Sequence, residues 1–242
     1  MQFLTRIPVP SRPYVADSLA RSVKFFPLVG MVVGCGSALL HVLLAPHLPR
    51  LATAFFILLY LVIVTGGLHE DGLADVADGF GGGTSRDKIL LILRDSRIGS
   101  YGGLALAFSL LGRVLLIATL PLAQVPYYLV AAQVLCRWTP LPLSYSLSSA
   151  RDSPIPEVDG QGARIARHVS MATLIGGTIF SFAVAVVLLK GHAIASILTV
   201  IIVSWLSGIY YKRRIGGVTG DCFGATIQLA EVGVYLCGVW TL

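Results

Sequence analysis

Three aspartates, Asp71, Asp75 and Asp78, follow a long apolar run with spacings of four and three residues. Residues at i, i+4 and i+7 lie on one face of a helix, so the carboxylates form a single stripe. Like charges so placed repel one another unless a divalent cation or water screens them, and carboxylate oxygens are ligands that Mg²⁺ and Mn²⁺ prefer. The stripe covers about 10 Å, so two ions, or one ion and water, fit it better than one bridging ion. A solvated helix end is the alternative, but beside a membrane span ionisable groups are costly and usually functional.

Basic residues and glycines share the polar stretch 69–101 with these aspartates. Four basic side chains in it can neutralise phosphate: Arg86, Lys88, Arg94 and Arg97. Arginine also offers two parallel hydrogen bonds. Gly82 and its neighbours allow a bulky ligand to approach the backbone closely. Acidic and basic groups together suit phosphoryl transfer, in which metals and cations stabilise spreading charge. The alternative for each basic residue is a role in membrane topology alone.

Further polar residues lie in or beside apolar runs. Asp221 is either a metal ligand or an N-cap of the last apolar segment. His69 is a candidate ligand, proton carrier or hydrogen-bonding orienter, or an ordinary interfacial histidine. Arg113 and Arg137 lie inside apolar segments, at about 2.5–3.5 kcal/mol each on insertion scales. Pairing with Glu231 would give these arginines a structural role, whereas lining a wet cavity open to the cytoplasm would give them a functional one.

The elements that position these residues are membrane helices, because the chain of 242 residues is 55% hydrophobic and only 12% charged. Several windows reach the roughly 20 apolar residues of a spanning helix. The net charge of +6 does not indicate a nucleic-acid partner, since the basic residues lie in short segments between apolar runs. The four cysteines show no CxxC spacing, so neither a disulfide framework nor a thiolate metal site is expected. No cleavable signal peptide is visible.

We predict an all-α, polytopic membrane bundle that forms one catalytic domain, residues 1–242, with an amphipathic surface helix over 85–97. The expected spans are seven: 25–45, 51–68, 104–120, 127–147, 169–189, 193–211 and 221 to the C-terminus. A GxxxG pattern, Gly30 to Gly34, predicts close helix packing in the first span. Lys and Arg are concentrated in alternate loops, which places the N-terminus and the acidic stretch on the cytoplasmic side of the membrane.

Three motifs resemble the cobalamin synthase family, the adenosylcobinamide-GDP ribazoletransferases, which are integral membrane enzymes. They are HEDGLADVADG at 69–79, RDSRIGSYG at 94–102 and GVTGDCFGA at 217–225. FLTRIPVP at 3–10 and FPLVG at 26–30 are similar to the family pattern as well. The resemblance covers nearly the whole chain, and the motifs occur in the expected order.

The resemblance implies a Mg²⁺-dependent reaction in which the 3′-hydroxyl of α-ribazole, or of its 5′-phosphate, attacks the cobinamide-side phosphorus of adenosylcobinamide-GDP. GMP leaves and a phosphodiester remains. Carried onto this sequence, the metal ligands are Asp71, Asp75, Asp78, Asp95 and Asp221. Catalytic roles fall to His69 and the first three of these aspartates. Expected substrate contacts are Gly82, Arg86, Arg94, Ser96, Arg97 and Arg137. The expected partners are these two substrates and the lipid bilayer, and a homo-oligomer is compatible with the sequence.

Three other functions compete with this one. The acidic stretch is also similar to that of the CDP-alcohol phosphotransferases, but their longer, differently spaced pattern is not matched. A cation or solute transporter would use charged residues near the bilayer midplane, whereas the aspartates here cluster at one end beside arginines. A structural membrane subunit would need no acidic stripe. The chain has no P-loop, G-x-S-x-G or HExxH motif.

Overall fold

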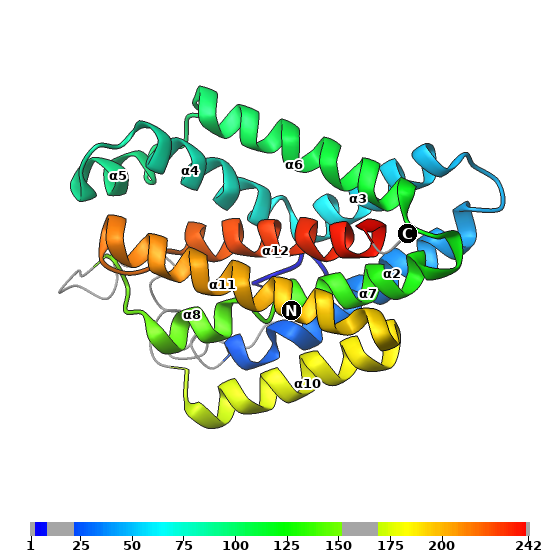
Figure 1. Cartoon of the computed structure of the whole chain (residues 1–242). Coiled ribbons are helices and arrows are strands. Elements are labelled where there is room, and N and C mark those ends of the chain that lie inside the picture. Colours follow the sequence, from blue (N-terminus) through cyan, green and yellow to red (C-terminus); the bar gives the residue numbers. More distant parts are fainter. Residues whose placement is uncertain (1–2, 9–21, 152–168, 241–242) are drawn as a thin grey trace.

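A computed structural model describes residues 3–8, 22–151 and 169–240 as a bundle of helices (Figure 1). The α-helices are α2 (Phe26–Leu44), α3 (Arg50–Thr65), α4 (Leu68–Gly82), α5 (Arg86–Ile92), α6 (Ser100–Thr119), α7 (Val125–Cys136), α8 (Pro140–Ser146), α10 (Met171–Leu189), α11 (Ala193–Ile215) and α12 (Gly220–Trp240). These described parts contain no strand, only one isolated bridge between Ser149 and Val218. The all-α prediction is therefore confirmed. Most of the basic N-terminal segment and of the polar loop 148–168 lies outside the described residues.

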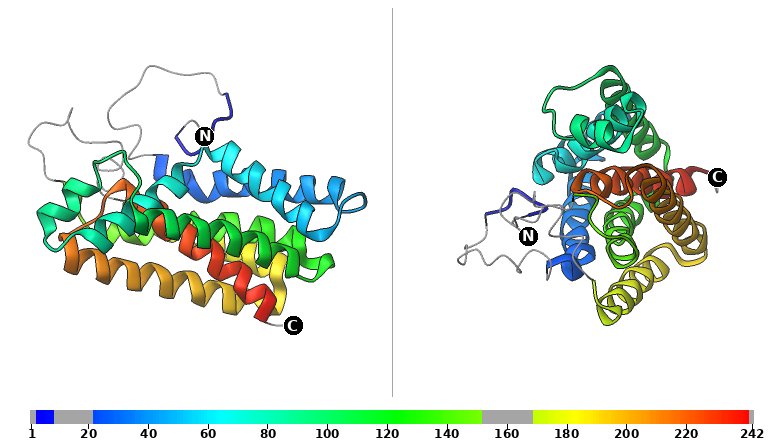
Figure 2. Two further views of the ribbon diagram at one scale, coloured as in Figure 1. Left: turned by 90° about the horizontal axis from the view of Figure 1, so that it is seen from above. Right: turned by 90° about the vertical axis from the view of Figure 1, so that its left-hand side faces the viewer.

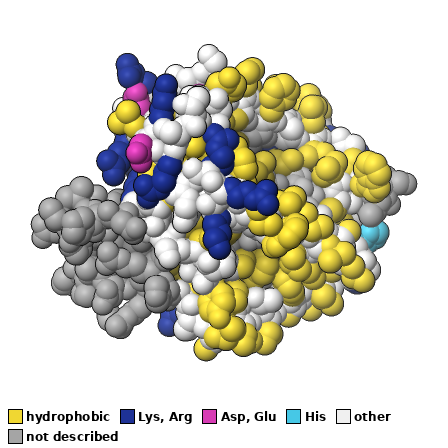
Figure 3. Space-filling model, turned by 60° about the vertical axis from the view of Figure 1, so that its left-hand side comes forward, with side chains coloured by type: hydrophobic (Ala, Val, Ile, Leu, Met, Phe, Trp, Pro, Cys, Tyr) yellow, Lys and Arg dark blue, Asp and Glu magenta, His cyan; other side chains and the backbone are white. Residues whose placement is uncertain are grey.

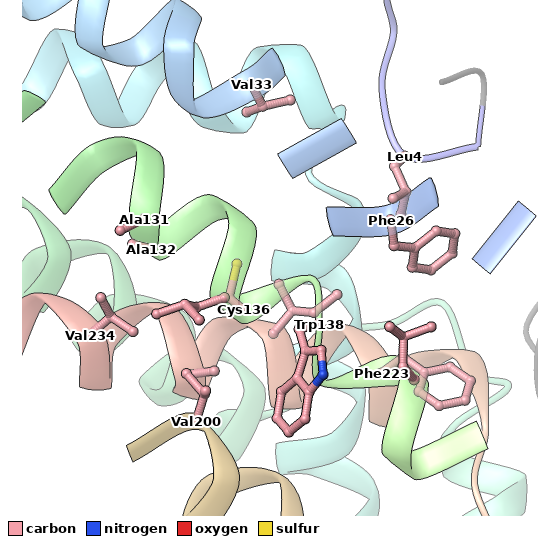
Figure 4. Packing of buried hydrophobic residues seen from close by; sticks show 14 of the residues in the cluster. Leu4, Phe26, Val33, Ala131, Ala132, Cys136, Trp138, Val200, Phe223 and Val234 are labelled. Carbon is pink, nitrogen blue, oxygen red and sulfur yellow. The ribbon is translucent and has the colours of Figure 1, made fainter. Parts of the chain in front are cut away.

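Helix α12 lies at the centre of the bundle, with α4 and α6 on one side and α7 and α11 on the other (Figures 1 and 2). Its buried apolar residues join a core to which α2, α7 and α11 contribute (Figure 4). Phe223 and Val234 of α12 lie in this core together with Cys136 at the end of α7. The last apolar segment of the sequence thus organises the fold, because helices on every side pack against it.

Close packing of α2 against α7 depends on the predicted glycine pair. A Cβ added at Gly30 would lie 2.1 Å from the carbonyl oxygen of Gln133, and one at Gly34 would lie 2.7 Å from the Cα of Val130. Neither distance leaves room for a methyl group, so the backbones approach only because both residues are glycine. The GxxxG prediction is confirmed, and this surface of α2 is used inside the protein.

Among the residues that the structure describes, four helical stretches are long and apolar enough to cross a membrane: Val23–Leu44, Ser100–Thr119, Met171–Ile215 and Gly220–Trp240. Their outer faces carry large apolar side chains, such as Phe108 on α6, Val187 on α10 and Ile194 on α11, each at least 67% exposed. Such exposure suits lipid and not water, so this is a helical membrane protein. A fifth crossing results only if α3 and α4, bent by 87°, are counted as one span.

The seven predicted spans are not confirmed, for two structural reasons. The expected span 127–147 is divided into α7 and α8, with a turn over 137–139, and neither helix reaches 18 residues. The expected spans 169–189 and 193–211 correspond to α10 and α11, which form one candidate stretch of 45 residues and lie side by side in Figure 1. The hydropathy pattern located the apolar segments correctly, but it did not reveal how each segment is broken.

The apolar helix does not continue into the acidic stretch. Gly66 and Gly67 both take left-handed backbone angles, with φ of 67° and 71°, and they end α3 and begin α4. Most other residues are strained at such angles, so the two glycines permit the 87° bend. The aspartate stripe survives because Asp71, Asp75 and Asp78 all lie within α4.

The predicted amphipathic helix is shorter than expected. Helix α5 begins after Ser85, whose hydroxyl caps the backbone N–H of Lys88, and it spans only seven residues. Ile89, in the middle of α5, is buried, and a Cβ at Gly79 or Gly83 would contact it. α5 therefore packs on the end of α4 through its apolar side. A role on the membrane surface remains a prediction.

Candidate active site

The acidic helix α4 contacts the start of α12 through two glycines. A Cβ at Gly72 would lie 2.9 Å from the carbonyl oxygen of Asp221 and 3.2 Å from the Cα of Gly224. Only glycines allow the two backbones to come this close. The contact brings Asp221 to the aspartate stripe, from which it is separated by more than 140 residues in the sequence.

The electrostatics of Asp75 indicate that Asp71, Asp78 and Asp221 are near enough to act on its carboxylate. Asp75 is half-buried on α4, which lies beyond the four candidate spans. Burial, followed by the charges of Asp221, Asp71 and Asp78, raises the pKa of Asp75 to about 7. Arg151 acts in the opposite direction and lowers it. Asp71 is exposed, so the cluster is open to solvent on one side.

Asp221 is not the residue that caps α12. The hydroxyl of Thr219 accepts the backbone N–H of Cys222 at 3.4 Å, which is the position of an N-cap. The Asp221 carboxylate instead accepts a hydrogen bond from Thr219 and contacts the guanidinium of Arg151, both at 3.2 Å. Of the two roles that the sequence left open, the structure therefore removes the capping role.

Asp78 supports the adjoining helix. Its two carboxylate oxygens accept the backbone N–H groups of Gly99, at 2.6 Å, and Gly102, at 2.9 Å, at the N-terminus of α6. A Cβ on either glycine would clash with the carboxylate. A carboxylate also stabilises the positive end of a helix dipole. Asp78 therefore has a structural function, whatever else it binds.

The donor set of this cluster fits Mg²⁺, which prefers carboxylate oxygens. Within the ranges that the structure describes, no three His, Cys, Asp or Glu side chains are close enough together to hold an ion unaided. Mg²⁺ does not require this, because it usually keeps several waters and binds one or two carboxylates together with substrate phosphates. Asp71 and Asp75, beside Asp221, meet that requirement.

The predicted ligand Asp95 lies on the basic loop and pairs with Arg97. Three hydrogen bonds join the side chains, at 3.0, 3.1 and 2.6 Å, and a fourth comes from the Arg97 backbone. These hydrogen bonds lower the pKa of Asp95 to about 2. The pair is exposed, so a substrate phosphate would compete with Asp95 for Arg97.

The other predicted substrate residues differ in their exposure and in whether their side chains already have hydrogen-bond partners. Arg94 and Ser96 are exposed, and no side-chain partner of either is found among the described residues. Gly82 is exposed, and a Cβ there would touch only Ile92. Arg86 donates to the carbonyl oxygens of residues 215 and 150, at 3.0 and 2.8 Å, and so ties three segments together. Figure 3 shows Lys and Arg side chains gathered at one end of the molecule, next to the hydrophobic surface.

The charged residues within the helices pair with one another. The Arg113 guanidinium lies 2.9 Å from Glu70 and 3.5 Å from Glu231, and all three side chains are buried. Gln228 also donates to Glu70, at 3.1 Å. The structural pairing that the sequence offered for Arg113 is therefore present, and it includes Glu70. Pairing of this kind is the usual way in which a membrane interior accommodates charge.

Arg137 and His69 are both buried in the interior. Arg137 donates to the side chain and the carbonyl oxygen of Gln133, and its Nε has no partner among the described residues. The Nε2 atom of His69 also lacks a described partner, and a Cβ at Gly224 would contact the His69 backbone. Neither side chain lies with the exposed arginines, so their predicted substrate and catalytic roles remain predictions.

Sequence reasoning overlooked Arg151 and Arg214. Arg151 was counted only as a basic residue of a loop, yet it contacts Asp221. Arg214 donates to the carbonyl oxygens of Phe80 and Gly83, at 3.2 and 2.9 Å, where α4 ends, and it stacks on Phe80. A cation suits the C-terminus of a helix. No spacing in the sequence marks either residue, because both partners are distant along the chain.

Comparison with known proteins agrees with the sequence motifs. Residues 1–239 match a family model described as cobalamin-5-phosphate synthase. A relative from Escherichia coli O45:K1, named adenosylcobinamide-GDP ribazoletransferase, is 37% identical over 238 residues, which cover 96% of this chain and 94% of the relative. A Polaromonas relative of the same name is 36% identical over 269 residues, which cover 98% and 93%. No solved structure matches the chain.

Proposed function

Since the chain belongs to the cobalamin-5-phosphate synthase family, we propose that it joins adenosylcobinamide-GDP to α-ribazole or its 5′-phosphate and releases GMP. The observation that carries the mechanism is the close contact of Gly72 with α12, which places Asp221 beside Asp71 and Asp75. An acidic cluster facing a basic loop suits a reaction in which an oxygen attacks phosphorus and a nucleotide leaves.

Asp71, Asp75 and Asp221 would hold Mg²⁺, which when bound stabilises charge on the reacting phosphate oxygens. Arg94 and Arg97 would bind the diphosphate, since both side chains are exposed on the loop next to α4. Gly82 leaves open space for a large substrate. Asp78 holds the N-terminus of α6 and fixes the shape of the site. The arrangement would bring the metal and the diphosphate to one open surface, which an in-line displacement requires.

The site would face the cytoplasm of a bacterial cell, with the chain embedded in the inner membrane. Two observations support this proposal: Lys and Arg gather at one end of the molecule, and the acidic helix lies beside these residues. Positive residues favour the cytoplasmic side. Seven crossings would follow if α3, α7 with α8, α10 and α11 each cross the bilayer, with α4 at the cytoplasmic end of α3. Alkaline phosphatase fused after the C-terminus should then be active, and fused near Gly83 inactive.

The test of function is GMP release from adenosylcobinamide-GDP and α-ribazole by the purified protein, with and without Mg²⁺. We expect release only with the metal, and loss of nearly all release for Asp71→Asn and Asp75→Asn. Asp87→Asn is the matched control, because Asp87 is an exposed acid on α5 whose only ion pair among the described residues is a weak one with Arg86. Metal-independent release, or normal release by both site variants, would refute the proposal.

A further inference from the structure

Arg151 lies between the acidic cluster and the basic loop. One of its terminal nitrogens, Nη2, contacts the Asp221 carboxylate at 3.2 Å and donates to the carbonyl oxygen of Leu93 at the same distance. Leu93 directly precedes Arg94, an exposed residue that is predicted to bind phosphate. The Nε of Arg151 is buried and has no partner among the described residues. Within the described residues, Arg151 thus has an unpaired donor between the acidic cluster and the basic loop.

Arg151 also provides positive charge next to the carboxylates of the acidic cluster. The backbone of α6 satisfies Asp78, which leaves Asp71, Asp75 and Asp221 as carboxylates without such support. Among the described residues, Arg151 is the cation that forms an ion pair with this group, and its partner is Asp221. A half-buried group of negative charges is unstable without a counter-charge. Arg151 supplies this counter-charge through its ion pair with Asp221.

Other arginines of the same region show what a purely structural role looks like. Arg214 donates to two backbone carbonyls and to a tyrosine hydroxyl, and it contacts no carboxylate of the site. Arg86 also donates to two backbone carbonyls, and its one carboxylate partner, Asp87, lies outside the cluster. Arg151 differs because its partner is a carboxylate that belongs to the acidic cluster.

We propose that Arg151 binds a phosphate of the substrate, and that its ion pair with Asp221 competes with the binding of a divalent cation at the acidic cluster. The proposal rests on the proposed function. A divalent cation would repel the guanidinium from Asp221, and the incoming diphosphate would give it a new partner with two parallel hydrogen bonds. Arg151 thereby exchanges one anion for another and remains paired in both states.

This exchange makes a prediction that a structural role does not. If Arg151 competes with the cation, removing its charge strengthens metal binding while weakening substrate binding. We expect Arg151→Gln to bind Mn²⁺ roughly tenfold more tightly than wild type. Mn²⁺ binding is measured by electron paramagnetic resonance in the absence of nucleotide. The same variant should bind adenosylcobinamide-GDP roughly tenfold more weakly in the presence of Mg²⁺. Arg213→Gln is the matched control. It removes the same charge from a side chain that is exposed on α11 and does not contact the cluster.

Arg151→Lys keeps the experiment informative if the glutamine variant does not fold. Lysine keeps the charge but loses the planar fork, so Mn²⁺ binding should stay near wild type while substrate binding weakens. The exchange is refuted if Arg151→Gln binds Mn²⁺ as tightly as wild type or more weakly. This conclusion requires that the wild type itself binds Mn²⁺ and releases GMP. For the lysine variant, unchanged substrate affinity refutes it. A wild-type protein that neither binds Mn²⁺ nor releases GMP refutes the proposed function, and the exchange with it.

Discussion

Asp78→Asn should destabilise the protein, in contrast to the same change at Asp75. Asp78 accepts two backbone N–H bonds at the N-terminus of α6, and the amide nitrogen of asparagine cannot accept either of them. One charge-assisted hydrogen bond is therefore lost, and the amide NH₂ of asparagine then faces a backbone N–H, which is also a donor. Such a bond is worth about 1.5–3 kcal/mol, which we reduce to about 1–2 kcal/mol because the site is partly exposed. Asp75 makes no hydrogen bond of this kind in the described structure, and its charge is disfavoured by neighbouring carboxylates.

The assay is thermal unfolding of the purified protein in detergent, without metal or nucleotide. At about 2–4 °C per kcal/mol for a chain of this size, Asp78→Asn should lower the midpoint by about 2–8 °C. Asp75→Asn should leave the midpoint unchanged or raise it. If both variants melt like wild type and lose activity equally, Asp78 acts as a ligand alone, and its anchoring of α6 contributes nothing to stability.

Three further predictions concern the contact between α4 and α12. Gly72→Ala should lower stability by about 1–3 kcal/mol and reduce GMP release, because the added methyl group would clash with the Asp221 backbone. Gly103→Ala is the control, because a Cβ at Gly103 would have no atom within 4 Å. Equal melting temperatures of the two variants would contradict the packing argument. Thr219→Ala should cost about 0.5–2 kcal/mol of stability as a lost N-cap. Asp221→Asn should retain stability and lose activity, and an active Asp221→Asn variant would exclude Asp221 from the site.

The sequence by itself determined the structural class and the family of this protein. Apolar runs located the helices to within a few residues, because burial in lipid requires nearly continuous hydrophobicity. The spacing of Asp71, Asp75 and Asp78 predicted one helical face, since that periodicity is local. The motifs around them identified the family, which the comparisons confirmed.

Tertiary structure decided what depends on residues far apart in the chain. The bend at Gly66 and Gly67 cannot be read from hydropathy, because glycine is common in membrane helices and only the backbone angles show the break. The N-cap of α12 is Thr219 and not Asp221, because the Thr219 hydroxyl oxygen accepts the backbone N–H of Cys222. The pairing of Arg151 with Asp221 joins positions 70 residues apart, and only the packing of α4 on α12 gives that ion pair its place beside the aspartate stripe.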